Sequence, residues 1–155
     1  MELYLFIFIL KVSYIGVLSI SIVDCSLNVS KEGRSVYAIF SSQLSCFGDN
    51  TDSIRINAKG KYPDIIFDNT IFYFPVFEVS GNIIGRKITT INILVKRQRP
   101  KWKDKKESFG AIHLETFIPE SIMNASFEEQ IILSQDSTKK GYFVFDMKYT
   151  RYDNK

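Results

Sequence analysis

The sequence predicts an all-β protein, an antiparallel β-sandwich that follows an apolar amino-terminal segment. Beyond residue 24, apolar residues recur at every second position in short stretches, and no long stretch has helical periodicity. Turn-forming Gly, Asn and Asp residues separate these stretches. The 155 residues, 45% apolar and 24% charged, suffice for one core and exclude a disordered chain.

The amino-terminal segment, residues 3–23, is apolar apart from three serines and Lys11. We expect residues 1–21 to be a signal peptide cut before Ile22, because Ser19 and Ser21 have the spacing that a signal peptidase accepts. Glu2 and the lack of an early Lys or Arg are atypical of signals. An uncleaved membrane anchor within residues 3–23 is the second interpretation. Two buried strands opening an intracellular domain are the third, since the segment is rich in β-branched residues.

Two downstream features favour the secretory pathway, and with it a secreted, luminal or amino-terminally anchored protein. Asn28 and Asn124 each begin an Asn-x-Ser sequon and are predicted glycosylation sites. Cys25 and Cys46 are predicted to form a disulfide that closes a loop of about 20 residues and stabilises the fold by roughly 3 kcal/mol. Residues 22–155 then form a single sandwich domain.

The first half of this domain contains three predicted strands. Residues 36–46 alternate, with Val36, Ala38, Phe40, Leu44 and Cys46 on one face. Residues 48–53 form a turn before a short strand at 54–58. Residues 65–77 are the most apolar stretch, with a hairpin turn at 68–69 and with Pro75 limiting which strands can pair there.

The second half contains four more predicted strands. Residues 90–95 and 112–118 flank a long charged loop and are expected to form a hairpin. Residues 127–133 and 142–149 follow, joined by a turn at 135–141, and residues 119–125 indicate a helical turn. The last strand is predicted to direct Phe143, Phe145, Met147 and Tyr149 inward and Asp146 and Lys148 outward. Many short strands favour an immunoglobulin-like sandwich over a barrel, and its numerous Phe side chains are expected to fill a core rather than line a lipid cavity.

The sequence offers little for catalysis. His113 with Glu115 is the one candidate base and orienting carboxylate, and we expect His113 to be an ordinary surface residue. No nucleophile elbow or phosphate-binding loop occurs. One His and two Cys cannot supply a structural zinc site. We therefore predict no enzymatic activity, no cofactor and no metal.

A basic segment, residues 96–107, is the strongest local feature. It contains seven basic and two acidic residues, a net charge of +5 where the whole chain carries +3. Such a cluster around a Trp can bind an anionic polymer or a lipid surface; the alternative is a solvated connection that prevents edge-to-edge association. The candidate ligand-binding residues are Lys96, Arg97, Arg99, Lys101, Trp102, Lys103, Lys105 and Lys106. A protein, an anionic glycan or an anionic lipid is favoured as partner over nucleic acid.

The carboxyl end resembles the closing strands of the luminal domain of the translocon-associated protein beta subunit. The similarity is carried by Asn124-Ala125-Ser126, the apolar residues 131–133, Lys139-Lys140-Gly141-Tyr142-Phe143 and Tyr149. Glu32-Gly33-Arg34 is similar to its opening strand, and the resemblance covers about a third of the chain. It implies an endoplasmic reticulum domain that assists translocation by contact, without catalysis.

Together these observations predict a non-enzymatic, secreted or luminal binding module that acts through protein or anionic-ligand contacts. One alternative is an intracellular structural or interaction protein whose apolar start belongs to the core. The other is a translocon-associated accessory domain.

Overall fold

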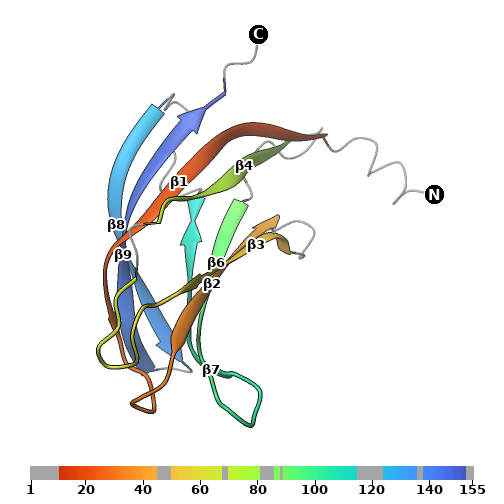
Figure 1. The fold of residues 1–155 in the computed structure, drawn as a ribbon. Helices are drawn as coiled ribbons and strands as arrows, with labels where there is room; N and C mark the ends of the chain where they lie inside the picture. The colour runs from red at the N-terminus through yellow and green to blue at the C-terminus, as the bar shows by residue number, and fades with distance from the viewer. Residues whose placement is uncertain are drawn as a thin grey trace, which may run out of the picture.

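The computed structural model describes residues 11–44, 50–67, 70–80, 86–87, 89–114, 124–135 and 138–152. Nine antiparallel strands in these residues form one sheet with the order β3-β2-β6-β7-β8-β9-β1-β4-β5. The sheet folds over so that β1, β8 and β9 lie opposite β2, β6 and β7 (Figure 1). The fold turns at the β7–β8 junction, where Phe109 and Ser134 are the pair that joins the two layers. The predicted all-β sandwich is confirmed.

The strands are β1 (Lys11–Leu27), β2 (Val36–Leu44), β3 (Asn50–Asn57), β4 (Phe72–Ser80), β5 (Arg86–Lys87), β6 (Thr89–Arg97), β7 (Lys105–His113), β8 (Asn124–Gln135) and β9 (Thr138–Arg151). Alternating burial along them follows the period of two in the sequence. On β9, Phe143, Phe145, Met147 and Tyr149 are buried as predicted, while Asp146 and Lys148 are exposed.

Strand β1 lies inside the sheet, between β9 and β4. Leu18 and Ile20 are completely buried and Ile22 nearly so. The third interpretation of the apolar start, a buried part of the core, matches this arrangement, with one long strand in place of two among the described residues. The structure gives no support to a cut before Ile22, because that cut would remove most of a central strand. Among the described residues, no helix is long and apolar enough to cross a membrane.

Aromatic side chains fill the space between the two layers. Phe40 of β2 packs against Phe72 of β4 with ring centroids 4.8 Å apart, and against Phe145 of β9 at 5.8 Å. Phe143 contacts Phe67 at 5.4 Å, edge to face. These rings come from both layers, so the Phe residues in the described core serve packing, as the sequence predicted.

Several predicted boundaries are wrong. Asp52 and Ser53 belong to β3 and not to a turn, and Asn124 and Ala125 begin β8 and not a helical turn. Both segments continue a strand because their backbone groups pair with neighbouring strands: Asp52 lies opposite Ser42, and Asn124 opposite Thr150. The predicted turn at residues 68–69, the predicted strand end at residues 115–118 and the rest of the helical turn, residues 119–123, lie outside the described residues.

The turn predicted at residues 135–141 is also shorter than expected, since β8 extends to Gln135 and β9 begins at Thr138. Gly141 lies inside β9 with φ at 122°, and a Cβ there would come within 1.9 Å of the Ser26 carbonyl oxygen. Close approach of the β1 backbone therefore requires glycine at this position.

The predicted disulfide receives no support. Cys25, on β1, is a free cysteine in the structure, and Cys46 lies outside the described residues. Cys25 is near the end of β1 that leads into β2, whereas Leu44, the last described residue before Cys46, ends β2 about 26 Å further along that strand. Burial, and then the neighbouring Asp24, raises the pKa of the Cys25 thiol to about 11, so the reactive thiolate is disfavoured at neutral pH.

Candidate functional site

The basic segment is a β-hairpin and not a long loop. Lys96 and Arg97 end β6, and Lys105 to Glu107 begin β7, with Arg97 opposite Lys105 in the register. This confirms the predicted pairing of these two strands and shortens the connection to residues 98–104. The segment looked like a loop because its charged residues hide the strand pattern, which the ladder hydrogen bonds nevertheless extend.

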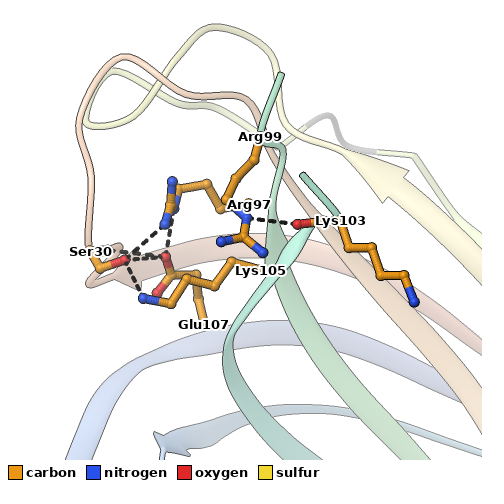
Figure 2. A network of polar contacts seen from close by, with 6 residues as sticks. All are labelled: Ser30, Arg97, Arg99, Lys103, Lys105 and Glu107. Carbon is orange, nitrogen blue, oxygen red and sulfur yellow. Dashed lines mark hydrogen bonds and ion pairs between the residues drawn. The ribbon is translucent and has the colours of Figure 1, made fainter. Parts of the chain in front are cut away.

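A buried polar network fixes the base of the hairpin (Figure 2). Arg97 Nε donates to Glu107 Oε1 at 2.9 Å, and the side chains of Arg97 and Glu107 are only 7% and 2% exposed. The Ser30 hydroxyl, from the connection between β1 and β2, donates to the same carboxylate oxygen at 2.6 Å, and the Ser30 backbone N–H donates to it at 3.2 Å. Arg97 was predicted to bind ligand; this is wrong, because its charge is buried against Glu107.

The network keeps Glu107 ionised. Burial alone would raise the pKa of this carboxyl group. The hydrogen bonds from Ser30 and Arg97, together with the charge of Arg97, outweigh burial and hold the pKa below its ordinary value. The ionised carboxylate in turn neutralises Arg97 inside the protein.

A second set of contacts holds the far end of the connection. The Tyr37 hydroxyl, on β2, donates a hydrogen bond to Asp104 Oδ2, and the Arg55 guanidinium lies 3.6 Å from the centre of the Tyr37 ring. Burial and the bond to Asp104 raise the pKa of Tyr37 to about 12. The same bond is the main reason that the pKa of Asp104 is lowered. Tyr37 therefore anchors the hairpin from the neighbouring strand.

Between these anchors, the connection is closed on itself and its tip faces solvent. Arg99 Nε donates to the Lys103 carbonyl at 2.7 Å, and the Gln98 N–H donates to the Ser35 carbonyl at 2.9 Å. Lys101, Trp102 and Lys103 are exposed, with Trp102 at 75%. The tip thus presents a large aromatic ring between two ammonium groups on a fixed base.

The remaining predicted ligand residues fall into two groups. Lys106 is exposed, while Lys96, Arg99 and Lys105 are partly buried. Lys96 and Lys106 lie opposite each other in the register, so the hairpin brings their charges together. Lys105 Nζ lies 3.4 Å from the Ser30 hydroxyl and takes part in the network. The structure therefore gathers seven of the eight predicted residues as accessible or partly accessible groups and removes Arg97.

Sequence reasoning missed a small pocket beside the hairpin. It has a volume of about 180 Å³ and is lined by Gly33, Arg34, Ser35, Lys61, Gln98, Arg99 and Pro100. Arg34 and Lys61 were not identified because each is an isolated basic residue in its own part of the sequence. The fold brings both to the base of the basic segment, and no local pattern announces this.

The other predicted site residues are placed as follows. Asn28 and Asn124 are exposed, so both sequons are accessible, and their glycosylation stays a prediction. His113 is exposed on β7, opposite Thr90, and Glu115 lies outside the described residues. The described part of the chain holds no group of three or more His, Cys, Asp or Glu side chains that could bind a metal.

A larger hollow, of about 430 Å³, lies across the outer face of β1, β4, β8 and β9. Its lining mixes Ser19 and Ser21 with Tyr73, Asp146 and Lys148. One acidic and one basic side chain give it no net charge. It therefore differs from the basic end of the molecule, where cations predominate.

Comparisons with known proteins identify the fold. No family model and no curated protein matches the chain. Among solved structures, a C2 domain of plant Extended Synaptotagmin 1 is similar with a TM-score of 0.66 and 11% identity, over 92% of this chain and 99% of that one. Human GIVD cytosolic phospholipase A2 is similar with a TM-score of 0.58 and 10% identity, over 93% of this chain and 17% of that one.

At such low identity the likeness concerns the fold alone. The immunoglobulin-like form of the sandwich is not confirmed, and nothing supports the resemblance to the translocon-associated protein beta subunit. Both kinds of sandwich have two antiparallel layers and the same alternation along each strand, so sequence periodicity does not distinguish them. The chain has the β-sandwich fold of a C2 domain.

Proposed function

We propose that this protein is a non-enzymatic module that docks on anionic lipid membranes through the tip of the β6–β7 hairpin. The observation that carries the proposal is the position of Trp102, 75% exposed between two exposed lysines on a hairpin whose base is fixed by a buried ion pair. A ring this exposed contributes little to folding, whereas an indole is well suited to the headgroup region of a bilayer, with its apolar body in the lipid and its N–H near water.

The charges around Trp102 suit an anionic surface. Lys101, Lys103 and Lys106 are exposed, and each contributes about 1 kcal/mol when it lies close to an anionic leaflet. Burial of the indole adds about 2 kcal/mol. The sum of about 5 kcal/mol corresponds to a dissociation constant in the upper micromolar range, which is that of a reversible membrane contact.

The fixed base makes this contact efficient. The Arg97–Glu107 pair and the Tyr37–Asp104 bond hold both ends of the connection before any membrane is present. Little conformational freedom of the backbone is then lost on binding, so more of the interaction energy appears as affinity. A solvated spacer between two strands would not need these buried anchors.

The comparisons support a lipid partner over the other anions considered. The matched proteins include a C2 domain of an extended synaptotagmin and a phospholipase, an enzyme named for its phospholipid substrate. The likeness is one of fold, so it supports the proposal without carrying it. The secretory location remains a prediction from the sequons and the apolar start.

Flotation with lipid vesicles tests the proposal. The wild-type protein is expected to float with phosphatidylcholine vesicles that contain phosphatidylserine and to stay behind with pure phosphatidylcholine. Trp102→Ala, and separately Lys101→Gln with Lys103→Gln, are each expected to weaken binding by about tenfold or more. Because all three side chains are exposed, the free energy of unfolding should change by less than about 0.5 kcal/mol.

The matched control is Lys148→Gln, which removes an exposed lysine from the outer face of β9, away from the hairpin. This variant should bind like the wild type. Binding that is equal for neutral and anionic vesicles, or that survives the combined tip substitutions, would refute docking through the hairpin tip.

A further inference from the structure

The small pocket beside the hairpin is formed by three segments that are distant in the sequence. Gly33, Arg34 and Ser35 come from the connection between β1 and β2, Lys61 from the connection between β3 and β4, and residues 98–100 from the hairpin. Its volume of about 180 Å³ is below the roughly 300 Å³ at which pockets for drug-sized ligands begin. A small polar group fits this size better than a whole cofactor does.

The lining of the pocket is cationic. Arg34, Lys61 and Arg99 contribute three positive charges, and no Asp or Glu is among the described residues that line it. The Nε atom of Arg34 is buried and has no hydrogen-bond partner in the described part of the chain. A buried donor without a partner is rare in folded proteins and costs free energy until an acceptor reaches it. The pocket therefore offers positive charge and an unused buried donor.

Backbone hydrogen bonds tie the three segments together. The Gly33 N–H donates to the Tyr62 carbonyl at 2.7 Å, and the Tyr62 N–H donates to the Arg34 carbonyl at 3.0 Å. The Gln98 N–H donates to the Ser35 carbonyl at 2.9 Å, which joins the hairpin to the same assembly. These bonds bring the cationic side chains together without a ligand, so the mutual repulsion of their charges is present before an anion binds.

We infer that this pocket binds a phosphomonoester. A phosphomonoester carries a charge between −1.5 and −2 at neutral pH and offers several acceptor oxygens, and guanidinium groups bind such oxygens through paired N–H donors. Three cations around one pocket match this charge better than the single negative charge of a phosphodiester. Arg34 Nε supplies a donor inside the pocket, while Lys61 and Arg99 add charge around it.

The pocket and the hairpin tip are linked through Arg99. This residue lines the pocket, and its Nε holds the Lys103 carbonyl beside Trp102. On the proposed function, which this inference extends, an indole at the headgroup level would bring the pocket close to phosphates that project from the bilayer. The phosphomonoester can then belong to a phosphorylated lipid headgroup or to a soluble phosphate ester, and the experiment separates these two sources.

The first arm uses a soluble probe, inositol 1,4,5-trisphosphate, with unphosphorylated inositol as the negative control, in titration calorimetry. Wild-type protein should bind the trisphosphate and not inositol. Arg34→Gln and Lys61→Gln should each weaken this binding by at least tenfold. The combined variant Lys101→Gln with Lys103→Gln is the matched control, since it removes two cations from the tip and leaves the pocket lining intact; it should bind the trisphosphate like the wild type.

The second arm compares vesicles containing phosphatidylinositol 4,5-bisphosphate with phosphatidylserine vesicles of equal surface charge. A lipid source predicts tighter binding to the phosphoinositide, and Arg34→Gln should abolish that preference while binding to phosphatidylserine persists. If the pocket-dependent trisphosphate binding occurs without this preference, the source is a soluble ester.

Two results would overturn the pocket site: no binding of the trisphosphate by wild type, or equal binding by wild type and Arg34→Gln. Urea denaturation of Arg34→Gln verifies that the variant is folded, and Lys61→Gln, at an exposed position, provides a second test if it is not. Docking through the tip has its own readout in phosphatidylserine vesicles, so the failure of one proposal is distinguishable from the failure of the other.

Discussion

Glu107 connects the packing of the sandwich to the basic hairpin. Its carboxylate accepts hydrogen bonds from Arg97 and Ser30, which belong to two different parts of the chain. A buried arginine without this partner would be an uncompensated charge, and the loss of one member of such a pair is strongly destabilising. The exposed lysines at the tip depend on this neutralised base.

Replacing Glu107 with Gln should lower the free energy of unfolding by about 3 kcal/mol at neutral pH, because Arg97 stays charged and buried. The folded-state pKa of Glu107 is lowered from 4.5, so the unfolded chain binds more protons as the solution is acidified. The contribution of the ionised carboxylate is therefore complete above pH 4.5 and is lost as pH falls through the folded pKa.

Urea denaturation across this pH range measures the effect, with the exposed Glu128→Gln as control. The difference between wild type and Glu107→Gln should shrink below pH 4.5. A difference that stays constant or grows on acidification would contradict the role assigned to the ion pair.

The sequence identified Trp102 and the lysines beside it, because an aromatic ring inside a run of cations is a local pattern. It could not separate Arg97 from those lysines. Whether a charged residue faces solvent or a buried carboxylate depends on the pairing of β6 with β7 and on Ser30, which is 77 positions away from Glu107. Arg34 and Lys61 were missed for the same reason.

At the level of elements, β1 shows how one pattern fits two structures. A secretory signal and a strand inside a sheet are both apolar and tolerate β-branched residues. The sequence also contained the deciding signal: Ser19 and Ser21 alternate with Leu18, Ile20 and Ile22, of which the apolar members are buried. The spacing of the two serines, which suits a signal peptidase, is also the period of a strand.

Substitutions within β1 distinguish the two structures. Ile20→Ala should lower the free energy of unfolding by about 3 kcal/mol, because it leaves a cavity at a completely buried position. Val23→Ala, at a position 53% exposed on the same strand, should change it by less than about 0.5 kcal/mol. Chemical denaturation of purified protein, with its intact mass determined, measures both.

If residues 1–21 were removed from the mature protein, Ile20→Ala could not affect its stability. Equal unfolding free energies for wild type and Ile20→Ala, with a mass lacking these residues, would contradict the place of β1 in the core.

At the level of the whole molecule, the alternation along the strands predicted two packed layers but not their strand order. The order β3-β2-β6-β7-β8-β9-β1-β4-β5 brings together strands far apart in the chain, such as β1 with β9. Such pairings depend on which sheet edges meet during folding, and a period of two contains no information on them. The immunoglobulin-like prediction failed at this point.

Charge is distributed unevenly over the molecule. Residues 96–107 carry +5 while the whole chain carries +3, so the rest of the protein has a net negative charge. An anionic membrane therefore attracts the hairpin and weakly repels the remainder, which orients the protein with its tip toward the lipid. Because this attraction is electrostatic, it should weaken as ionic strength rises.

The fluorescence of Trp102 tests this account most directly, because the chain contains 1 Trp and the signal reports on the tip alone. Vesicles that contain phosphatidylserine should shift its emission to shorter wavelength as the indole leaves water, high salt should reverse the shift, and phosphatidylcholine vesicles should leave the emission unchanged. Emission that stays unchanged while the protein floats with the anionic vesicles would show that another surface binds the membrane.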